Sequence, residues 1–245
     1  MPHNIYNWAF RPLFHMLMVN NLLFVVATPF EIAPLHTWLE ESTKKVADNI
    51  YNMKGLTITI LVTGVGTFNM SFQCGKLFGS GYKPQLAVNA GLAGTFDTAL
   101  ELTTVVNVYK DTFADVGVYE KDGSFTSIFD LELIKPDVIP FKQGWLENDS
   151  HLASFLPNKT AITVNATSGD EARIKVLKDK YNADLESMEG ASFAHACQMS
   201  SIPYLQIRAL SNYVEPRNRM NWKIDQSIAR LNEVLIHMVQ AYAAP

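Results

Sequence analysis

The sequence is poor in cysteine. Only two of its 245 residues are cysteines, Cys74 and Cys197, and they lie far apart without a C-x-x-C spacing. A disulfide framework and a thiolate zinc site are therefore not expected, and the sequence implies no metal. We expect both cysteines to be small buried side chains of a protein kept in a reducing compartment, the cytoplasm.

The chain also lacks an excess of positive charge. Twenty Lys and Arg residues stand against 24 Asp and Glu residues, which gives a net charge of −4. A nucleic-acid partner is therefore not expected. Apolar residues make up 48% and charged residues 18%, which excludes a disordered polymer, and the length allows one large α/β domain with a full core.

No apolar run reaches the roughly 18 residues of a membrane span. The most apolar stretch, residues 10–26, is interrupted by four polar residues, and no A-x-A cleavage site follows it. We expect no membrane partner. Residues 1–17 are interpreted as an N-terminal extension ahead of a domain at 18–245, with a processed leader as the alternative.

Short β-rich runs alternate with helical patterns along the rest of the chain. This alternation predicts a single-domain, three-layer α/β/α fold with a mainly parallel, partly mixed central sheet. The less regular stretch 110–158 is interpreted as extra strands and loops on one side. Strands are predicted at 22–27, 57–63, 86–90, 103–109, 161–164, 183–185 and 204–209, and helices at 31–53, 67–78, 170–181, 188–199 and 222–242.

Polar or glycine-rich segments follow several predicted strands, where open α/β sheets bind ligands. They are TPFE at 28–31, TGVG at 63–66, NAGLAG at 89–94 and SN at 211–212, with SMEG at 187–190 at a strand-to-helix junction. Taken singly they are equally typical of tight turns and helix-end carboxylates. A Rossmann-type oxidoreductase is disfavoured because Asn69 occupies the third glycine position of a dinucleotide fingerprint.

Taken together, these segments resemble the motifs of a known family. VVATPFEIAPL, TGVGTFN, NAGLAGTFD, ESMEGASFAHAC and IRALSNYV have the order and spacing of the nucleoside phosphorylase/nucleosidase family. The chain resembles its methylthioadenosine/adenosylhomocysteine nucleosidase branch and, within that branch, is most similar to the futalosine hydrolases of the alternative menaquinone pathway. The resemblance covers about residues 22–243 and implies hydrolysis of a nucleoside without a cofactor.

The resemblance implies a role for each motif residue. Glu31 is implied as the base that activates water, and Glu189 as the carboxylate that accepts hydrogen bonds from the ribose hydroxyls. Met188 is implied to pack against the sugar, with a core methionine as the alternative, and Ala93 and Gly94 to contact the substrate. These residue types suit a reaction that passes through an oxocarbenium-like sugar.

Asn212 departs from the adenine-specific nucleosidases, which carry Asp at this position. A carboxylate accepts two hydrogen bonds, whereas a carboxamide accepts one and donates one, which matches a 6-oxopurine protonated at N7. A mismatch would leave a buried polar group unpaired, at a cost of roughly 1–3 kcal/mol. The sequence therefore favours hypoxanthine as leaving group, and futalosine is a 5′-modified inosine.

A second departure concerns the residue that stacks on the purine. The family often places an aromatic residue soon after its S-G-D segment, but SGD at 168–170 leads into Glu171 and Ala172. The stacking residue stays unidentified, and Asp170 is expected to cap the following helix.

Water is the expected nucleophile, because no arginine lies between Arg11 and Arg173 to hold a phosphate. The segment 215–222 offers Arg217 and Arg219 as partners for the benzoate of futalosine, with Trp222 and Tyr213 as flat surfaces. A solvated basic loop is the alternative.

Other functions remain open at this point. They are a methylthioadenosine/adenosylhomocysteine-type nucleosidase, a purine nucleoside phosphorylase, and a non-catalytic nucleoside-binding module. The expected partners are a small-molecule nucleoside and further copies of the chain, as a homo-oligomer.

Overall fold

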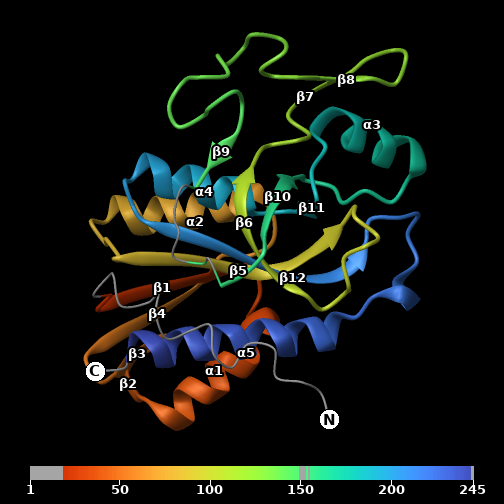
Figure 1. Ribbon diagram of the computed structural model, residues 1–245. Helices are drawn as coiled ribbons and strands as arrows, with labels where there is room; N and C mark the ends of the chain where they lie inside the picture. Colours follow the sequence, from red (N-terminus) through yellow and green to blue (C-terminus); the bar gives the residue numbers. More distant parts are fainter. Residues whose placement is uncertain (1–18, 149–152, 154, 244–245) are drawn as a thin grey trace.

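A computed structural model describes residues 19–148, 153 and 155–243 (Figure 1). The predicted extension at 1–17 lies outside the described residues. The strands are β1 (Asn21–Val26), β2 (Lys44–Ala47), β3 (Ile50–Met53), β4 (Leu56–Val62), β5 (Leu86–Thr95), β6 (Val105–Asp111), β7 (Gly117–Tyr119), β8 (Phe125–Ser127), β9 (Leu146–Glu147), β10 (Asn158–Thr163), β11 (Leu185–Ser187) and β12 (Tyr204–Tyr213). The helices are α1 (Pro29–Ser42), α2 (Thr67–Gly79), α3 (Glu171–Tyr181), α4 (Gly190–Met199) and α5 (Ile224–Tyr242), with a 3₁₀ turn, η3 (Arg219–Asn221), before α5.

The predicted α/β fold class is confirmed. The order of the main sheet is β11-β10-β6-β12-β5-β1-β4-β3-β2. Its centre, β4-β1-β5-β12, is parallel, whereas the β2-β3-β4 edge and the β12–β6 pairing are antiparallel. The sheet also curls, because β11 pairs with β10 on one side and with β5 on the other.

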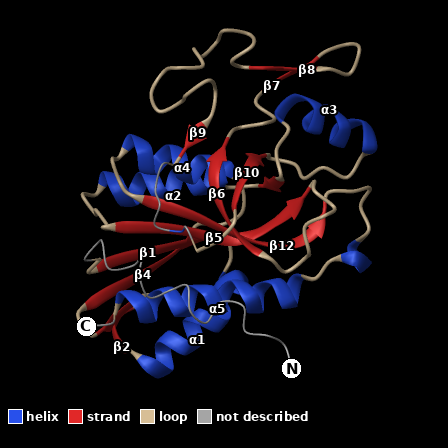
Figure 2. Ribbon diagram, in the orientation of Figure 1, coloured by secondary structure: helices blue, strands red, loops and turns tan. Residues whose placement is uncertain are grey.

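Helices cover both faces of this sheet (Figure 2), and a hydrophobic core lies on each face. Alternate residues of a strand point to opposite faces. Leu22, Phe24 and Val26 of β1 pack with α1 and α5, whereas Leu23 and Val25 pack with α2 and α4. The three predicted layers are therefore α1 and α5, the sheet, and α2 and α4.

The helix predicted at 31–53 is wrong beyond Ser42. Residues 44–53 form the β2–β3 hairpin, in which Asn49 has a positive φ of 57°. Thr43 ends α1 because its backbone is extended and both its N–H and its hydroxyl donate to the Leu39 carbonyl. The apolar side chains at Val46 and Ile50 have helical spacing, but Ile50 pairs with Thr59 of β4, so strand pairing overrides the periodicity.

Two strands near the predicted site run further than expected. β5 continues past Ala90 to Thr95, and β12 continues past Ala209 to Tyr213. Asn212 and Gly94 therefore lie in paired strands and not in loops. The extra strands predicted within 110–158 are present as β7, β8 and β9.

Two further predictions are confirmed. The Asp170 side chain accepts a hydrogen bond from the Arg173 N–H and caps α3. Cys74 and Cys197 are free and fully buried, and burial raises the pKa of both thiols. In the part of the chain that the structure describes, no helix is long and apolar enough to cross a bilayer.

Candidate active site

A cavity of about 300 Å³, here called the main cavity, opens at the carboxyl ends of β1, β5 and β12. Six of the eight residues predicted for the site line it. They are Glu31, Ala93, Gly94, Met188, Glu189 and Asn212. Segments far apart in the sequence thus meet at one place, because the carboxyl ends of parallel strands share an edge of the sheet.

Glu31 lies in the first turn of α1, directly after β1. Its Oε2 accepts hydrogen bonds from the N–H and the hydroxyl of Thr28, at 3.0 and 3.1 Å, so the helix-capping interpretation is observed. Its Oε1 accepts from the Leu92 N–H at 3.3 Å. A Cβ at Gly91 would lie 2.9 Å from this Oε1, so the glycine lets the carboxylate approach β5.

Glu189 directly precedes α4 and lines the main cavity. Its Oε1 accepts a hydrogen bond of 2.8 Å from the N–H of Gly66, which has a φ of +95°. Burial raises the pKa of Glu189 above its usual range, and the Gly66 bond opposes that effect. The TGVG turn therefore contributes a backbone donor that holds this carboxylate in place.

Arg208 is a buried cation beneath the site that the sequence analysis missed. Its guanidinium donates to the Asn89 carbonyl at 3.0 Å, to the Ile207 carbonyl at 3.1 Å and to the Asn89 side chain. Burial lowers its pKa, whereas the charges of Glu189, Asp111 and Glu31 raise it. A charged residue inside the apolar strand YLQIRAL is a signal that could have indicated it, since buried arginines are paired.

Asn212, near the end of β12, also lines the cavity. Its Oδ1 accepts from the Ser211 hydroxyl at 2.8 Å, and its Nδ2 donates to the Tyr213 carbonyl at 3.0 Å. A β-bulge between Leu210 and Asn212 interrupts the regular pairing with β5 at this point. One lone pair of the oxygen and one N–H of the amide are left for a ligand.

A second cavity of about 220 Å³, here called the side cavity, continues past Asn212. Five residues line both cavities: Gly94, Thr167, Glu186, Asn212 and Trp222. The side cavity adds Ser168, Gly169, Tyr213, Glu215 and Arg217. Of the loop arginines, Arg217 thus borders the site, whereas Arg219 lines neither cavity and lies with its guanidinium 5.8 Å from the Trp222 ring.

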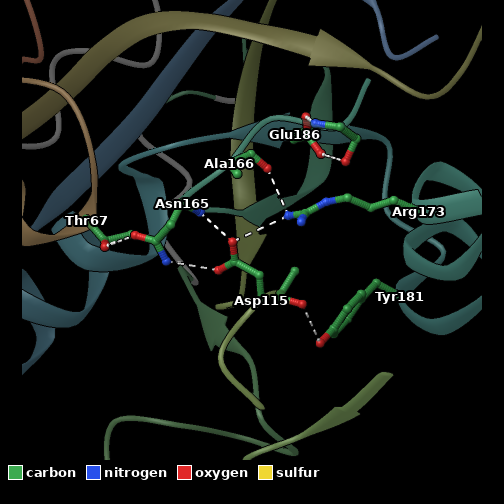
Figure 3. Close-up of polar contacts among 9 residues, drawn as sticks. Thr67, Asp115, Asn165, Ala166, Arg173, Tyr181 and Glu186 are labelled. Carbon is green, nitrogen blue, oxygen red and sulfur yellow. Dashed lines mark hydrogen bonds and ion pairs between the residues drawn. The ribbon is translucent and has the colours of Figure 1, made fainter. Parts of the chain in front are cut away.

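The loop between β10 and α3 forms a wall of both cavities and is held by polar contacts (Figure 3). Asp115 accepts from the N–H and the side chain of Asn165, at 2.6 and 3.0 Å. Arg173 lies 3.5 Å from Asp115 and donates to the Ala166 carbonyl at 2.8 Å. Thr67 of α2 donates to the other end of the Asn165 side chain.

Glu186 is a second residue that the sequence analysis missed. Its two oxygens accept from the N–H and the hydroxyl of Ser168, at 2.8 and 2.5 Å. Burial raises its pKa, and these bonds oppose the effect. It is the first residue of the ESMEG motif, and this membership is the sequence signal for it.

Buried carboxylates that face a cavity are typical of an enzyme active site. The fold and the site together define an α/β enzyme with its active site at the carboxyl edge of a curled, mixed sheet. The comparisons give the family. A model of the phosphorylase superfamily matches residues 21–243, and the chain belongs to this family.

Relatives of this chain include proteins with two different names. A futalosine hydrolase of Streptomyces coelicolor is 30% identical over 61% of this chain, and the chain spans 63% of that protein. A futalosine hydrolase of Thermus thermophilus is 28% identical over 73% of this chain and 80% of that protein. A 5′-methylthioadenosine/S-adenosylhomocysteine nucleosidase of Bacillus licheniformis is 22% identical over 86% of this chain and 94% of its own length.

The fold agrees with that of solved structures. The futalosine hydrolase of Helicobacter pylori superposes with a TM-score of 0.73 at 16% identity, over 91% of this chain and 98% of that one. At this identity the likeness concerns the fold alone.

Proposed function

We propose that this chain hydrolyses the N-ribosidic bond of futalosine and releases hypoxanthine, as a cytoplasmic enzyme of menaquinone biosynthesis. One observation carries the proposal: two carboxylates and a carboxamide line the same cavity at different levels of β5. Glu31 approaches β5 at Gly91, whereas Asn212 pairs with β5 at Gly94. Three residues of strand span roughly 10 Å, which suits a sugar and the base attached to it.

Each side chain has a task in this reaction. Glu31 accepts a proton from water as it attacks the anomeric carbon. Glu189 accepts hydrogen bonds from the ribose hydroxyls, and both carboxylates stabilise the positive charge that develops on the sugar. N7 takes up a proton from solvent as the bond to the sugar breaks, so that neutral hypoxanthine leaves, and Glu31 returns to solvent the proton that it took from water. Asn212 accepts from the N7–H of the leaving purine and donates to its O6.

Water fits this site better than phosphate as the nucleophile. The described lining of the main cavity includes Glu31, Glu186 and Glu189 but no lysine or arginine. Arg208 lies below them, but its guanidinium already donates to Asn89 and Ile207 and faces carboxylates. A phosphate here would be repelled by carboxylates without a free cation to hold it.

The other functions differ in what they require of the site. A methylthioadenosine/adenosylhomocysteine-type nucleosidase is the second candidate, since relatives carry that name, and Asn212 disfavours it for the reason given above. A non-catalytic nucleoside-binding module has no use for a water-activating carboxylate at Glu31.

A substrate panel tests the proposal. Futalosine, aminofutalosine, inosine and methylthioadenosine are each incubated with and without phosphate, and the released base is measured. We expect hypoxanthine release from futalosine to be fastest and independent of phosphate. A phosphate requirement, or a preference for methylthioadenosine, would contradict the proposal.

The role of Glu31 is tested within the same panel. We expect Glu31→Gln to bind futalosine and to lose at least 100-fold in kcat, because general-base catalysis contributes roughly 10²–10⁴-fold. The fold is checked by circular dichroism, since the amide can still accept from Thr28. A kcat close to that of wild type would contradict the role of Glu31 as the base that activates water.

A further inference from the structure

Glu186 and Asn212 lie on either side of the same glycine. Glu186 of β11 pairs with Gly94 of β5, and Asn212 of β12 pairs with Gly94 from the other side. Neighbouring strands are about 4.8 Å apart, so the Cα atoms of Glu186 and Asn212 are separated by roughly 10 Å. Both side chains line both cavities.

Gly94 keeps the space between them open. A Cβ at this position would lie 3.0 Å from the Asn212 Nδ2 and 2.8 Å from Val214 Cγ2. Any other residue would therefore crowd Val214 and the Asn212 carboxamide, which lies at the wall of both cavities. The bare backbone leaves room for a flat ligand with polar groups on neighbouring edges.

The Glu186 carboxylate retains acceptor capacity. It is 5% exposed, and each of its oxygens accepts one hydrogen bond, from the N–H or the hydroxyl of Ser168. A carboxylate oxygen has two lone pairs, so each oxygen can accept another donor. An ionised carboxylate offers acceptors only, and rotation of the group does not change this.

We propose that Glu186 is a specificity-determining residue that accepts the N1–H of a 6-oxopurine whose O6 and N7 are bound by Asn212. The inference rests on the proposed function and deepens it. In a 6-oxopurine, N1 carries a hydrogen next to O6, whereas in a 6-aminopurine N1 is a bare acceptor. Glu186 therefore favours the 6-oxopurine. It disfavours the 6-aminopurine, because the carboxylate and the bare N1 are both acceptors and would face each other in a buried site.

Glu186 adds a discrimination that Asn212 lacks. A carboxamide that turns by 180° exchanges its donor and its acceptor. The Tyr213 carbonyl opposes this turn, whereas the Ser211 hydroxyl can donate or accept and permits either orientation. The ionised Glu186 carboxylate has acceptors only, so turning it does not create a donor. Asn212 and Glu186 together bind two adjacent edges of the base. Discrimination against a 6-aminopurine comes mainly from Glu186.

The test is the ratio of kcat/KM for futalosine to kcat/KM for aminofutalosine. Glu186→Gln keeps the size of the side chain and an acceptor for the Ser168 N–H, but it can donate to the N1 of a 6-aminopurine. We expect the ratio to fall roughly tenfold or more, chiefly through loss of activity on futalosine. An unchanged ratio in the folded variant would overturn the proposal.

Ser168→Ala is the matched control. It removes the hydroxyl bonded to Glu186 Oε2 and leaves the carboxylate and the Ser168 N–H in place. If Glu186 only holds the loop, both variants lower the two kcat/KM values alike. If Glu186 reads N1, only Glu186→Gln changes the ratio.

A second measurement uses the wild-type enzyme and does not depend on how the variant folds. Hypoxanthine and 1-methylhypoxanthine are compared as product inhibitors, and we expect methylation of N1 to weaken inhibition at least tenfold. Equal inhibition would overturn the proposal. The proposed function fails separately, if wild type shows no preference for futalosine in the substrate panel.

Discussion

Asp111 at the end of β6 is buried completely beneath the site. Its Oδ1 accepts from the Thr163 hydroxyl at 3.0 Å, and the charge of Arg208 lies nearby. Burial raises the pKa of Asp111 to about 7, although Arg208 and the hydrogen bonds oppose the shift. Above this pH the protein therefore holds an ionised carboxylate in its interior.

This pKa predicts a pH-dependent stability. The pKa in the folded state lies above the unfolded value of about 4, so the folded state takes up a proton as the pH falls through 7. From pH 8 to pH 5, wild type should gain up to about 3 kcal/mol of unfolding free energy relative to Asp111→Asn. Urea unfolding of both proteins at the two pH values measures it. A difference that stays constant with pH would contradict the prediction.

Single residues of the site could be predicted from the sequence where they lie in a motif that resembles the family. Glu31, Met188, Glu189 and Asn212 lie in segments whose order along the chain resembles the family, and all four line the main cavity. Their roles stay predictions. Glu186 and the buried Arg208 lie within the same segments, but only the pairing of β5 with β11 and β12 brings them to the site.

At the scale of elements, the turn between β4 and α2 links backbone conformation to the site. Gly66 has a φ of +95° and donates its N–H to Glu189. Other residues adopt this backbone conformation only with strain. The turn therefore fixes a carboxylate that lies more than a hundred residues further along the chain.

Gly66→Ala should lower both stability and catalysis. Gly55→Ala is the matched control, since Gly55 has a φ of +92° and a Cβ there meets nothing within 4 Å. We expect each to cost roughly 1–2 kcal/mol of unfolding free energy, but only Gly66→Ala to lower kcat/KM, by tenfold or more. Thermal unfolding and steady-state kinetics measure the two effects. Equal kcat/KM values for Gly66→Ala and Gly55→Ala would show that the Gly66 turn does not contribute to catalysis, and would contradict the prediction.

The loop before α5 supports a second prediction at this scale. Arg217 and Arg219 are both exposed, but Arg217 lines the side cavity, whereas Arg219 lies beside Trp222 and lines neither cavity. We expect Arg217→Ala to raise the KM for futalosine several-fold and to change that for inosine little, because inosine lacks the benzoate. Arg219→Ala is the matched control, because it removes an exposed arginine of the same loop that lines neither cavity. Parallel losses on both substrates would instead place Arg217 beside the base, since it lies near Asn212.

The elements themselves were predictable to different degrees. Buried strands such as β1 and β4 have continuous apolar runs, and the pattern located them closely. The β2–β3 hairpin was missed because β2 is exposed throughout, so no alternation of apolar and polar residues marks it as a strand. The ends of β5 and β12 were missed because small and polar residues there weaken the apolar pattern, although the pairing continues.

At the scale of the whole molecule, exposed apolar side chains lie at the main cavity and on the neighbouring helix α2. Phe30 and Val65 line the cavity and are 58% and 46% exposed. Phe68 and Phe72 follow on α2, one helical turn apart, and are 71% and 66% exposed. A Cβ at Gly66 would lie 3.1 Å from the Phe68 ring, which places that ring at the edge of the site. Large exposed apolar groups gathered in this way are typical of a protein interface.

We therefore expect a second copy of the chain to cover this face and to complete the wall of the cavity. Phe68→Glu would place a charge in the interface, so it should convert the oligomer to a monomer and raise the KM for futalosine. Leu133→Glu is the matched control, because Leu133 is 72% exposed and lies in the stretch between β8 and β9, which lines neither cavity. Sedimentation velocity and steady-state kinetics on the same samples measure both effects. A wild-type protein that sediments as a monomer at assay concentrations would contradict the prediction, and so would a monomeric Phe68→Glu variant with an unchanged KM, because the partner copy would then contribute nothing to the site.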